Sequence, residues 1–440
     1  MPTKRAENRR LFLPSGLAGC ILFPIAVSLQ QNKTAGLSGK GYPRPQEKIM
    51  ETPASIDRRI DVADVLRGFA VMGIVLLHSV EHFNFYAYPD TANQSVWLNF
   101  TDRAVWDGLF FMFGGKGYAI FALLFGFSFF IMDDNQRRRG YDFRLRFCWR
   151  LVLLFLLGNL NASFFTGEVL VLYSIVGFIL PLACRLSDGR LLALACLLLV
   201  QPLALYFVVR AAWDASYVFP AIPTNALWGA AYQVQSSGTF WDTVRVNLWE
   251  GQLASLAWSW DNGRFFQTAA LFLFGLLIGR RGLFRREHRK VWSRVLLWAL
   301  AAFFPLYGLN NMLPDFIVNK SVLVPLSMLV SSLHKFAFTL ILVSCIIYIY
   351  YETGVGRRLL VFAPYGRMSL TNYLTQSVMG AMIFYNWGFG LYRTLGITAS
   401  VGVGVLLFLL QLSFCHWWMR CHRHGPFEYL WKKATWAGRS

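Results

Sequence analysis

Two ionisable side chains, Arg67 and His78, lie within an apolar stretch that runs from Val65 to Val80. An ionisable side chain inside a membrane-spanning helix costs about 2.5–3.5 kcal/mol on insertion scales, so its presence requires a reason. The two residues are eleven positions apart, so on an α-helix they share one face and lie about 16 Å apart. Asp64 precedes Arg67 by three positions, where its carboxylate can pair with the guanidinium. Because an imidazole titrates near neutral pH and suits proton transfer, this stripe is a candidate binding or catalytic site.

The same residues also have a structural interpretation, and the sequence leaves both open. Arg67 lies near the start of the apolar stretch, where a long basic side chain extends to the lipid headgroups. Asp64 would then only neutralise its charge. His78 lies close to Glu81 and His82 near the other boundary, where water would hydrate the ring.

A further candidate is Lys116, in the glycine-rich stretch "FGGKGYAIF". Several glycines together can interrupt a helix, and such a break at membrane depth is tolerated where the backbone lines a cavity or is buried in protein. One interpretation is a break that leads to a lysine facing an anionic ligand. The other is a surface turn with a hydrated lysine, followed by a helix over 117–131.

The segment "GRMSLTNYLTQS" opens a later apolar stretch with an unusual number of polar residues. Ser369, Asn372 and Gln376 are spaced by three and four positions and share one helical face. Such polar groups hydrogen-bond between membrane helices, at about 0.6 kcal/mol on average. Alternatively, they line a polar cavity with the first stripe, and Arg367 assists Arg67 in holding a phosphate.

Three more ionisable residues are candidates for a role inside the fold. Glu168 lies at a short turn between two apolar stretches, where it lines the same cavity or is hydrated. His334 and Lys335 lie near the middle of a long apolar segment, where charge is costly and a partner is expected.

Composition places these residues in a membrane protein. The chain of 440 residues is 56% hydrophobic and only 15% charged, whereas soluble domains are about 25% charged. The apolar residues form blocks of about 20 residues, the length that crosses a bilayer. The sequence therefore predicts an all-α polytopic bundle. The net charge of +19 is concentrated in short segments between these blocks, which favours orientation in an anionic membrane over nucleic-acid binding.

The basic segments also predict the topology. With ten spans, every segment rich in Lys and Arg falls on one side, so both ends of the core are expected in the cytoplasm of a bacterial inner-membrane protein. The predicted spans are 62–80, 106–131, 146–164, 168–184, 190–210, 265–279, 292–310, 322–350, 365–387 and 396–419.

Residues 50–440 are predicted to form a single membrane domain. Residues 1–49 combine a signal-like start with a polar linker and are interpreted as a dispensable extension. The segment 211–264 is an outer loop rich in Trp and Tyr, and residues 420–440 form a cytoplasmic tail. No spacing of the seven cysteines or the histidines indicates a disulfide framework or a metal site.

Six stretches carry a family resemblance: "DVLRGFAVMGIVLLHS", "GGKGYAIFALLFGFSFF", "RLVLLFLLGNLNASFFTGEVLVLYSIVG", "LFLFGLLIGRRGLF", "GRMSLTNYLTQS" and "HGPFEYLWKKATW". Together they resemble the YeiB family of bacterial inner-membrane proteins, known as domain of unknown function 418. The resemblance extends from Arg59 to Trp436. The chain departs from the usual family pattern at Asn161, Glu168 and Gly117, where a histidine, an aspartate and a phenylalanine are common.

The spacing of Arg67 and His78 is also similar to that in the acyltransferase-three superfamily of membrane acyltransferases. That resemblance implies transfer of an acyl group from a cytoplasmic carrier to an acceptor at the outer face. Arg67, with Asp64, Lys116 and Arg367, would bind the donor, with acyl-CoA as the candidate co-substrate and no other cofactor. His78 would be the general base for a small-molecule or envelope-glycan acceptor. The alternatives are a transporter for a small anionic or amphipathic solute and a non-catalytic envelope component.

Overall fold

The computed structural model of the chain describes residues 60–437 apart from positions 87, 89–91, 93, 215 and 221. Every regular element within these residues is a helix, which confirms the predicted all-α class. The predicted extension, residues 1–49, lies outside the described part of the chain.

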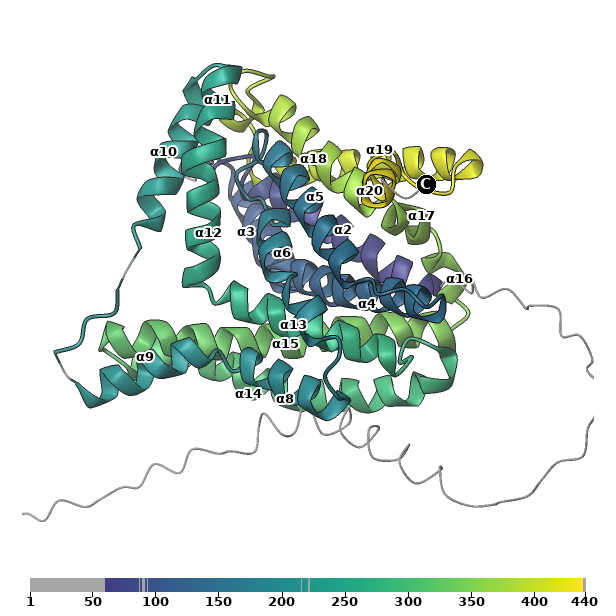
Figure 1. Cartoon of the computed structure of the whole chain (residues 1–440). Helices are drawn as coiled ribbons and strands as arrows, with labels where there is room; N and C mark the ends of the chain where they lie inside the picture. Colours follow the sequence, from purple (N-terminus) through teal and green to yellow (C-terminus); the bar gives the residue numbers. More distant parts are fainter. Residues whose placement is uncertain are drawn as a thin grey trace, which may run out of the picture.

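Helix α2 (Asp61–Val80) carries the candidate stripe and lies in the interior of the fold (Figure 1). Two glycines allow its close approach to the short helix α17 (Phe362–Arg367). A Cβ added to Gly68 would lie 2.3 Å from a carbonyl oxygen of α17, and one added to Gly366 would lie 1.9 Å from a carbonyl oxygen of α2. The two backbones are therefore in contact, as small residues allow between membrane helices. Further contacts of α2 are with α3 (Val96–Phe113), α4 (Gly117–Arg138), α15 (Lys320–Glu352), α18 (Ser369–Phe384) and α19 (Ile397–Cys421).

A second close contact joins α4 to α13 (Arg264–Arg280). A Cβ on Gly126 or on Gly275 would lie 1.9 Å from a carbonyl oxygen of the other helix. The long helices α14 (Arg289–Phe316) and α15 pack side by side in the lower part of Figure 1. The other α-helices are α5 (Arg144–Ala162), α6 (Leu170–Val176), α7 (Ile179–Ala183), α8 (Asp188–Leu199), α9 (Pro202–Trp213), α10 (Thr224–Ser237), α11 (Phe240–Val246), α12 (Gln252–Asp261), α16 (Gly356–Leu359) and α20 (Pro426–Trp436).

Six helical segments of the described chain are long and apolar enough to cross a bilayer, and the pair α8 and α9, bent by 48°, would make a seventh. Each coincides with a predicted span. The other predicted spans correspond to shorter helices: α6 with α7, α13, and α17 with α18. The structure thus supports a membrane protein with about six candidate spans, and the count of ten stays a prediction. The six segments are Asp61–Val80, Val96–Arg138, Arg144–Ala162, Arg286–Phe316, Lys320–Glu352 and Ile397–Cys421.

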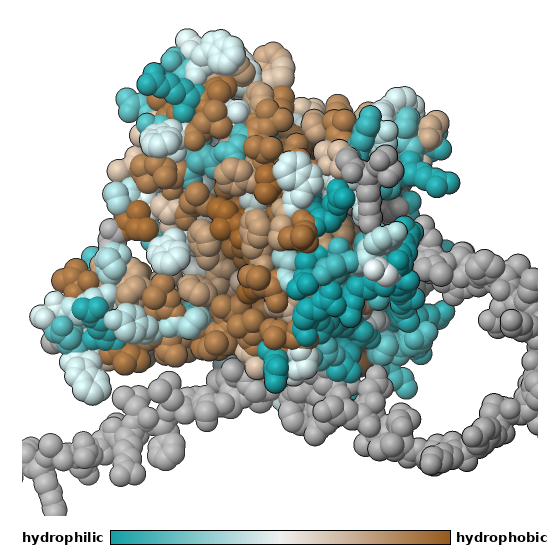
Figure 2. Space-filling model, in the orientation of Figure 1, coloured by the Kyte–Doolittle hydropathy of each residue, from teal (hydrophilic) through white to brown (hydrophobic). Residues whose placement is uncertain are grey.

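The connections predicted to be basic and cytoplasmic gather at one end of the molecule. Arg185 pairs with Asp142 at 3.4 Å, and Arg280 pairs with Asp188 at 2.9 Å, so the segments after α4, α7 and α13 meet. Tyr351, near the end of α15, donates a hydrogen bond to a carbonyl oxygen just after α13. In Figure 2, hydrophilic residues gather on the right of the view, where α4 ends and α16 lies, beside a broad apolar surface. That this end faces the cytoplasm stays a prediction.

Candidate functional site

Arg67 has polar partners on its own helix and on α4. Its Nη1 donates to Asp64 Oδ1 at 2.7 Å, as the spacing predicts, and its Nη2 donates to Ser128 Oγ of α4 at 2.6 Å. Arg367 of α17 donates from Nε to the other oxygen of Asp64 at 3.3 Å. The nearly buried carboxylate of Asp64 therefore lies between two guanidinium groups. Arg67 does not merely extend to the headgroups, since α4 fixes it inside the bundle.

Arg67 lines a cavity of about 130 Å³ between α2, α4, α5, α6, α18 and α20. A second arginine, Arg150, lies in its wall, with its guanidinium 3.4 Å from the ring centroid of Trp431. Ser369 also lines it, so the structure brings this residue together with Arg67. Two cations on apolar walls suit a ligand with an anionic group and an apolar part. The remaining lining residues are Phe121, Leu124, Phe125, Ser128, Met132, Phe147, Leu154, Leu170, Tyr173, Leu370 and Glu428.

The C-terminal tail closes this cavity. Glu428 of α20 accepts hydrogen bonds from the backbone N–H groups of Leu370 and Thr371, at 2.7 and 3.0 Å, and so caps the start of α18. Burial raises the pKa of Glu428 above its ordinary value. Trp431 donates from its ring nitrogen to the Arg150 carbonyl oxygen at 3.1 Å. The roles of Glu428 and Arg150 were missed from the sequence. The only signal was an acid after Gly-Pro in a basic tail.

His78 lies at the other end of the stripe, among aromatic rings. Its imidazole is 4.4 Å from the ring of Phe165 and 6.3 Å from that of Tyr373, centroid to centroid. The ring is half-buried, and its Nδ1 is buried without a hydrogen-bond partner in the described chain. The neighbouring His82 places its Nδ1 3.2 Å from the hydroxyl of Tyr232 in α10, so the predicted outer loop covers this region. His78 is therefore not simply hydrated, and it keeps a nitrogen available for proton exchange.

Glu168 is buried beside this aromatic group. Its carboxylate accepts hydrogen bonds from the side-chain amide of Asn161 and from the backbone N–H of Leu170. Burial raises the pKa of Glu168 to about 8, and these hydrogen bonds oppose the rise only in part. The backbone N–H of Val169 donates to the Tyr373 hydroxyl at 3.3 Å, which places Glu168 near the same tyrosine as His78. The Asn161 side chain thus binds the acid directly.

The two amides of α18 differ in their surroundings. Asn372 donates to the Tyr365 carbonyl oxygen at 2.9 Å and its own backbone oxygen accepts from Gln411 of α19, so it joins three helices. Gln376 is fully buried, and both of its amide atoms are without partners in the described chain. Asn372 therefore forms hydrogen bonds between helices, as the packing interpretation expects. Gln376 is the amide with unused hydrogen-bonding atoms, and its helix contacts α2.

Lys116 does not join Arg67. Ser128, which binds Arg67, lies twelve residues further along the chain through α4, or about 18 Å away. Lys116 is only 7% exposed, so it is not a hydrated surface lysine. It lies instead with Arg264 and Lys335, near the start of α4.

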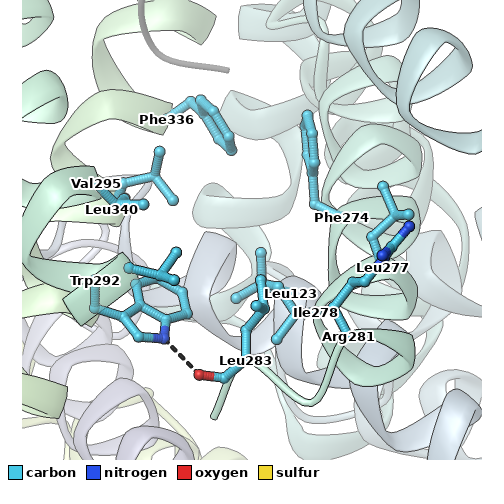
Figure 3. Close-up of a pocket in the computed structure, with 11 residues that line it drawn as sticks. Leu123, Phe274, Leu277, Ile278, Arg281, Leu283, Trp292, Val295, Phe336 and Leu340 are labelled. Carbon is cyan, nitrogen blue, oxygen red and sulfur yellow. Dashed lines mark hydrogen bonds between the residues drawn. The ribbon is translucent and has the colours of Figure 1, made fainter. Parts of the chain in front are cut away.

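Neither a second pocket nor a metal centre provides an alternative site in the described part of the chain. A pocket between α13, α14 and α15 is lined by apolar residues and Arg281, and the Trp292 ring nitrogen donates to the Leu283 carbonyl oxygen at its edge (Figure 3). Its volume of about 20 Å³ has room for little more than one water molecule. Within the described residues, no group of three His, Cys, Asp or Glu side chains is placed to hold a metal.

These features define the class: a helical protein with several candidate membrane spans and two polar regions at opposite ends of one buried helix. Residues 278–438 match the model of the family described as "Protein of unknown function (DUF418)". The chain is 29% identical over 409 residues to the uncharacterized protein YxaH of Bacillus subtilis, covering 87% of this chain and 96% of that one. It is 27% identical over 392 residues to the uncharacterized protein YeiB of Escherichia coli, covering 84% and 95%. The matches support a YeiB-like DUF418 family for this chain and confirm that expected resemblance.

Proposed function

We propose that this protein is a membrane-bound acyltransferase that passes an acyl group from a cytoplasmic thioester donor to an acceptor at the outer end of the bundle. The donor is acyl-CoA, and the acceptor is a small molecule or an envelope glycan. The protein lies in the bacterial cytoplasmic membrane, with both core ends in the cytoplasm and the lipid bilayer as its partner. The proposal starts from the likeness expected from the Arg67–His78 spacing and assigns each role to residues whose surroundings suit it.

The donor end is the cavity of Arg67. Arg67 and Arg150 offer guanidinium groups for the phosphates of the coenzyme, and the phenylalanines and leucines of the wall contact its apolar arm. Asp64 and Arg367 hold Arg67 in position, because the carboxylate binds both guanidinium groups. The elongated thioester then reaches along α2 toward His78, about 16 Å from Arg67.

His78 acts as the general base. It takes the proton from a hydroxyl or amine of the acceptor as that oxygen or nitrogen bonds to the thioester carbonyl carbon. The carbon–sulfur bond breaks, and the coenzyme leaves as a thiolate that receives the proton from the imidazolium. Glu168 and Gln376 line the acceptor end, where Gln376 offers unpartnered donor and acceptor atoms to the substrate.

The single observation that carries this proposal is the buried, unpartnered Nδ1 of His78 on the helix face that also presents Arg67 to a cavity. A polar atom left without a partner inside a protein is costly, so it is retained where a substrate or water completes it.

The test is thiol release from acyl-CoA by the full-length protein in lipid nanodiscs, with a detergent extract of envelope lipids and glycans as the acceptor source. His78→Asn is expected to lower the rate by about 10²–10⁴-fold, the usual contribution of a general base. The control is His416→Asn, since His416 is half-buried like His78 and its ring contacts a carbonyl oxygen of the α16–α17 connection, away from both proposed ends of the site. A wild-type protein without thiol release or acyl transfer, or a His78→Asn variant as active as wild type, would refute the proposal. Uptake of an unmodified anionic solute into proteoliposomes would favour a transporter instead.

A further inference from the structure

Three cationic side chains meet inside the bundle, away from the donor cavity. They are Lys116 before α4, Arg264 at the start of α13, and Lys335 near the middle of α15. Gly115 lies between two of them: a Cβ added there would be 2.8 Å from Arg264 Nη2 and 3.2 Å from Lys335 Cδ. The charges of Lys116 and Lys335 interact with each other and with that of Arg264. We call these three residues the cation cluster.

The cation cluster has two buried members and one half-buried member, Lys335, and none is balanced by an acid. Lys116 and Arg264 are each 7% exposed. None of the three cations forms an ion pair with a carboxylate in the part of the chain that the structure describes. Lys116 Nζ donates to the Phe110 carbonyl oxygen and Arg264 donates to Gln267 Oε1, both at 3.2 Å. These neutral partners, with the aromatic rings that flank both residues, orient the cations but leave their charge unbalanced.

An acid that interacts with the cation cluster is Glu81, whose charge acts on Arg264. Burial raises the pKa of Glu81 to about 7. A single carboxyl offsets at most one of the three cations.

Two further features of the site favour an anion. His334, beside Lys335, is 6% exposed, and its Nδ1 is buried without a hydrogen-bond partner in the described chain. The helices α4 and α13, of 22 and 17 residues, both begin at the cation cluster, and their N-terminal ends add partial positive charge. The helix N-terminal ends thus add to the positive charge of the three side chains, and His334 adds an unused hydrogen-bonding position.

Burying cations without counter-charges is strongly unfavourable, and an anion bound among them would remove most of that penalty. Three cations and two helix N-termini suit an oxyanion that carries more than one acceptor oxygen, as phosphate does, better than a single carboxylate. We propose that Lys116, Arg264 and Lys335 form a binding site for a phosphate group, either free phosphate or the phosphate of an anionic lipid headgroup.

The position of the site relates it to His78. A Cβ on Gly117, the first residue of α4, would lie 3.4 Å from Ile74 Cγ1, and Ile74 is one helical turn from His78 on α2. This nearness to His78 suggests that the bound phosphate group is part of the acyl acceptor, an assignment that rests on the proposed acyl transfer. Phosphate binding itself does not.

The test measures thermal unfolding of the full-length protein, freed of lipid in a phosphate-free maltoside detergent, against added inorganic phosphate and, separately, added phosphatidylglycerol. We expect one or both to raise Tm in the wild type. Lys335→Met is expected to weaken the apparent affinity at least about tenfold, the loss of one charge-assisted contact. Lys320→Met is the control, since Lys320 is an exposed lysine of the same helix.

The unliganded proteins provide a second measurement. Because Lys335→Met removes one of three repelling charges, its Tm without added anion is expected to equal or exceed that of the wild type. If Lys335→Met does not fold, Arg264→Gln replaces it. A response to inorganic phosphate assigns free phosphate, and a response to phosphatidylglycerol alone assigns a lipid headgroup. The proposal is overturned if neither probe stabilises the wild type, or if Lys335→Met and Arg264→Gln respond as the wild type does. Thiol release from acyl-CoA is independent of these results.

Discussion

Asp64→Asn is expected to destabilise the fold more than a typical surface change. The carboxylate of Asp64 has 4% of its side chain exposed and lies between Arg67 at 2.7 Å and Arg367 at 3.3 Å. The asparagine removes the negative charge between the two guanidinium groups, while Arg367 keeps its pair with Asp61 at 3.3 Å. Removing one member of a buried ion pair costs about 3–5 kcal/mol. The lower end, about 3 kcal/mol, applies here because the two arginine side chains stay 20% and 27% exposed.

The measurement is the free energy of unfolding in mixed micelles by denaturant titration. Asp107→Asn is the matched control, since Asp107 pairs with Arg103 at 3.9 Å on the surface and its loss is expected to cost under about 1 kcal/mol. Combining Asp64→Asn with Arg367→Gln is expected to recover part of the loss, because one of the two facing charges is removed. Equal destabilisation by Asp64→Asn and Asp107→Asn would refute the reasoning about the buried pair.

Three other outcomes follow from individual contacts. Burial raises the pKa of Glu168 from 4.5 to about 8, so the folded protein binds this proton more tightly than the unfolded chain does. The free energy of unfolding should therefore fall as pH rises across that range. In Glu168→Gln, this pH-dependent component should be absent when unfolding is measured from pH 5 to pH 8. Gly275→Ala should lower Tm by an amount equivalent to about 1–3 kcal/mol, since the new Cβ would meet a carbonyl oxygen at 1.9 Å, whereas Gly108→Ala, in open space, should not. Glu428→Ala removes the acceptor at the start of α18 and should cost about 1–2 kcal/mol, with faster proteolysis of the tail.

Local patterns in the sequence predicted the helices and one ion pair well. The apolar run after Asp61 defines α2 almost to the residue, because Glu81 and the turn that follows end it. The pairing of Asp64 with Arg67 follows from helical periodicity alone and is confirmed at 2.7 Å.

Contacts between distant helices were not predictable in the same way. Lys116 was assigned either to the donor or to water, yet it lies with Arg264 and Lys335, which come from helices far along the chain. Trp431 reaches the Arg150 carbonyl oxygen across a separation of 281 residues, and no periodicity reports such a contact. The spacing of the glycines does not predict that the backbones of α4 and α13 are in contact.

The most direct test of the central proposal is an experimental structure of the full-length protein with a non-hydrolysable thioether analogue of acyl-CoA. We expect the coenzyme phosphates to contact Arg67 and Arg150 and the carbonyl of the analogue to lie within hydrogen-bond reach of His78. An analogue bound elsewhere, or bound with its carbonyl remote from His78, would contradict the proposed acyl transfer.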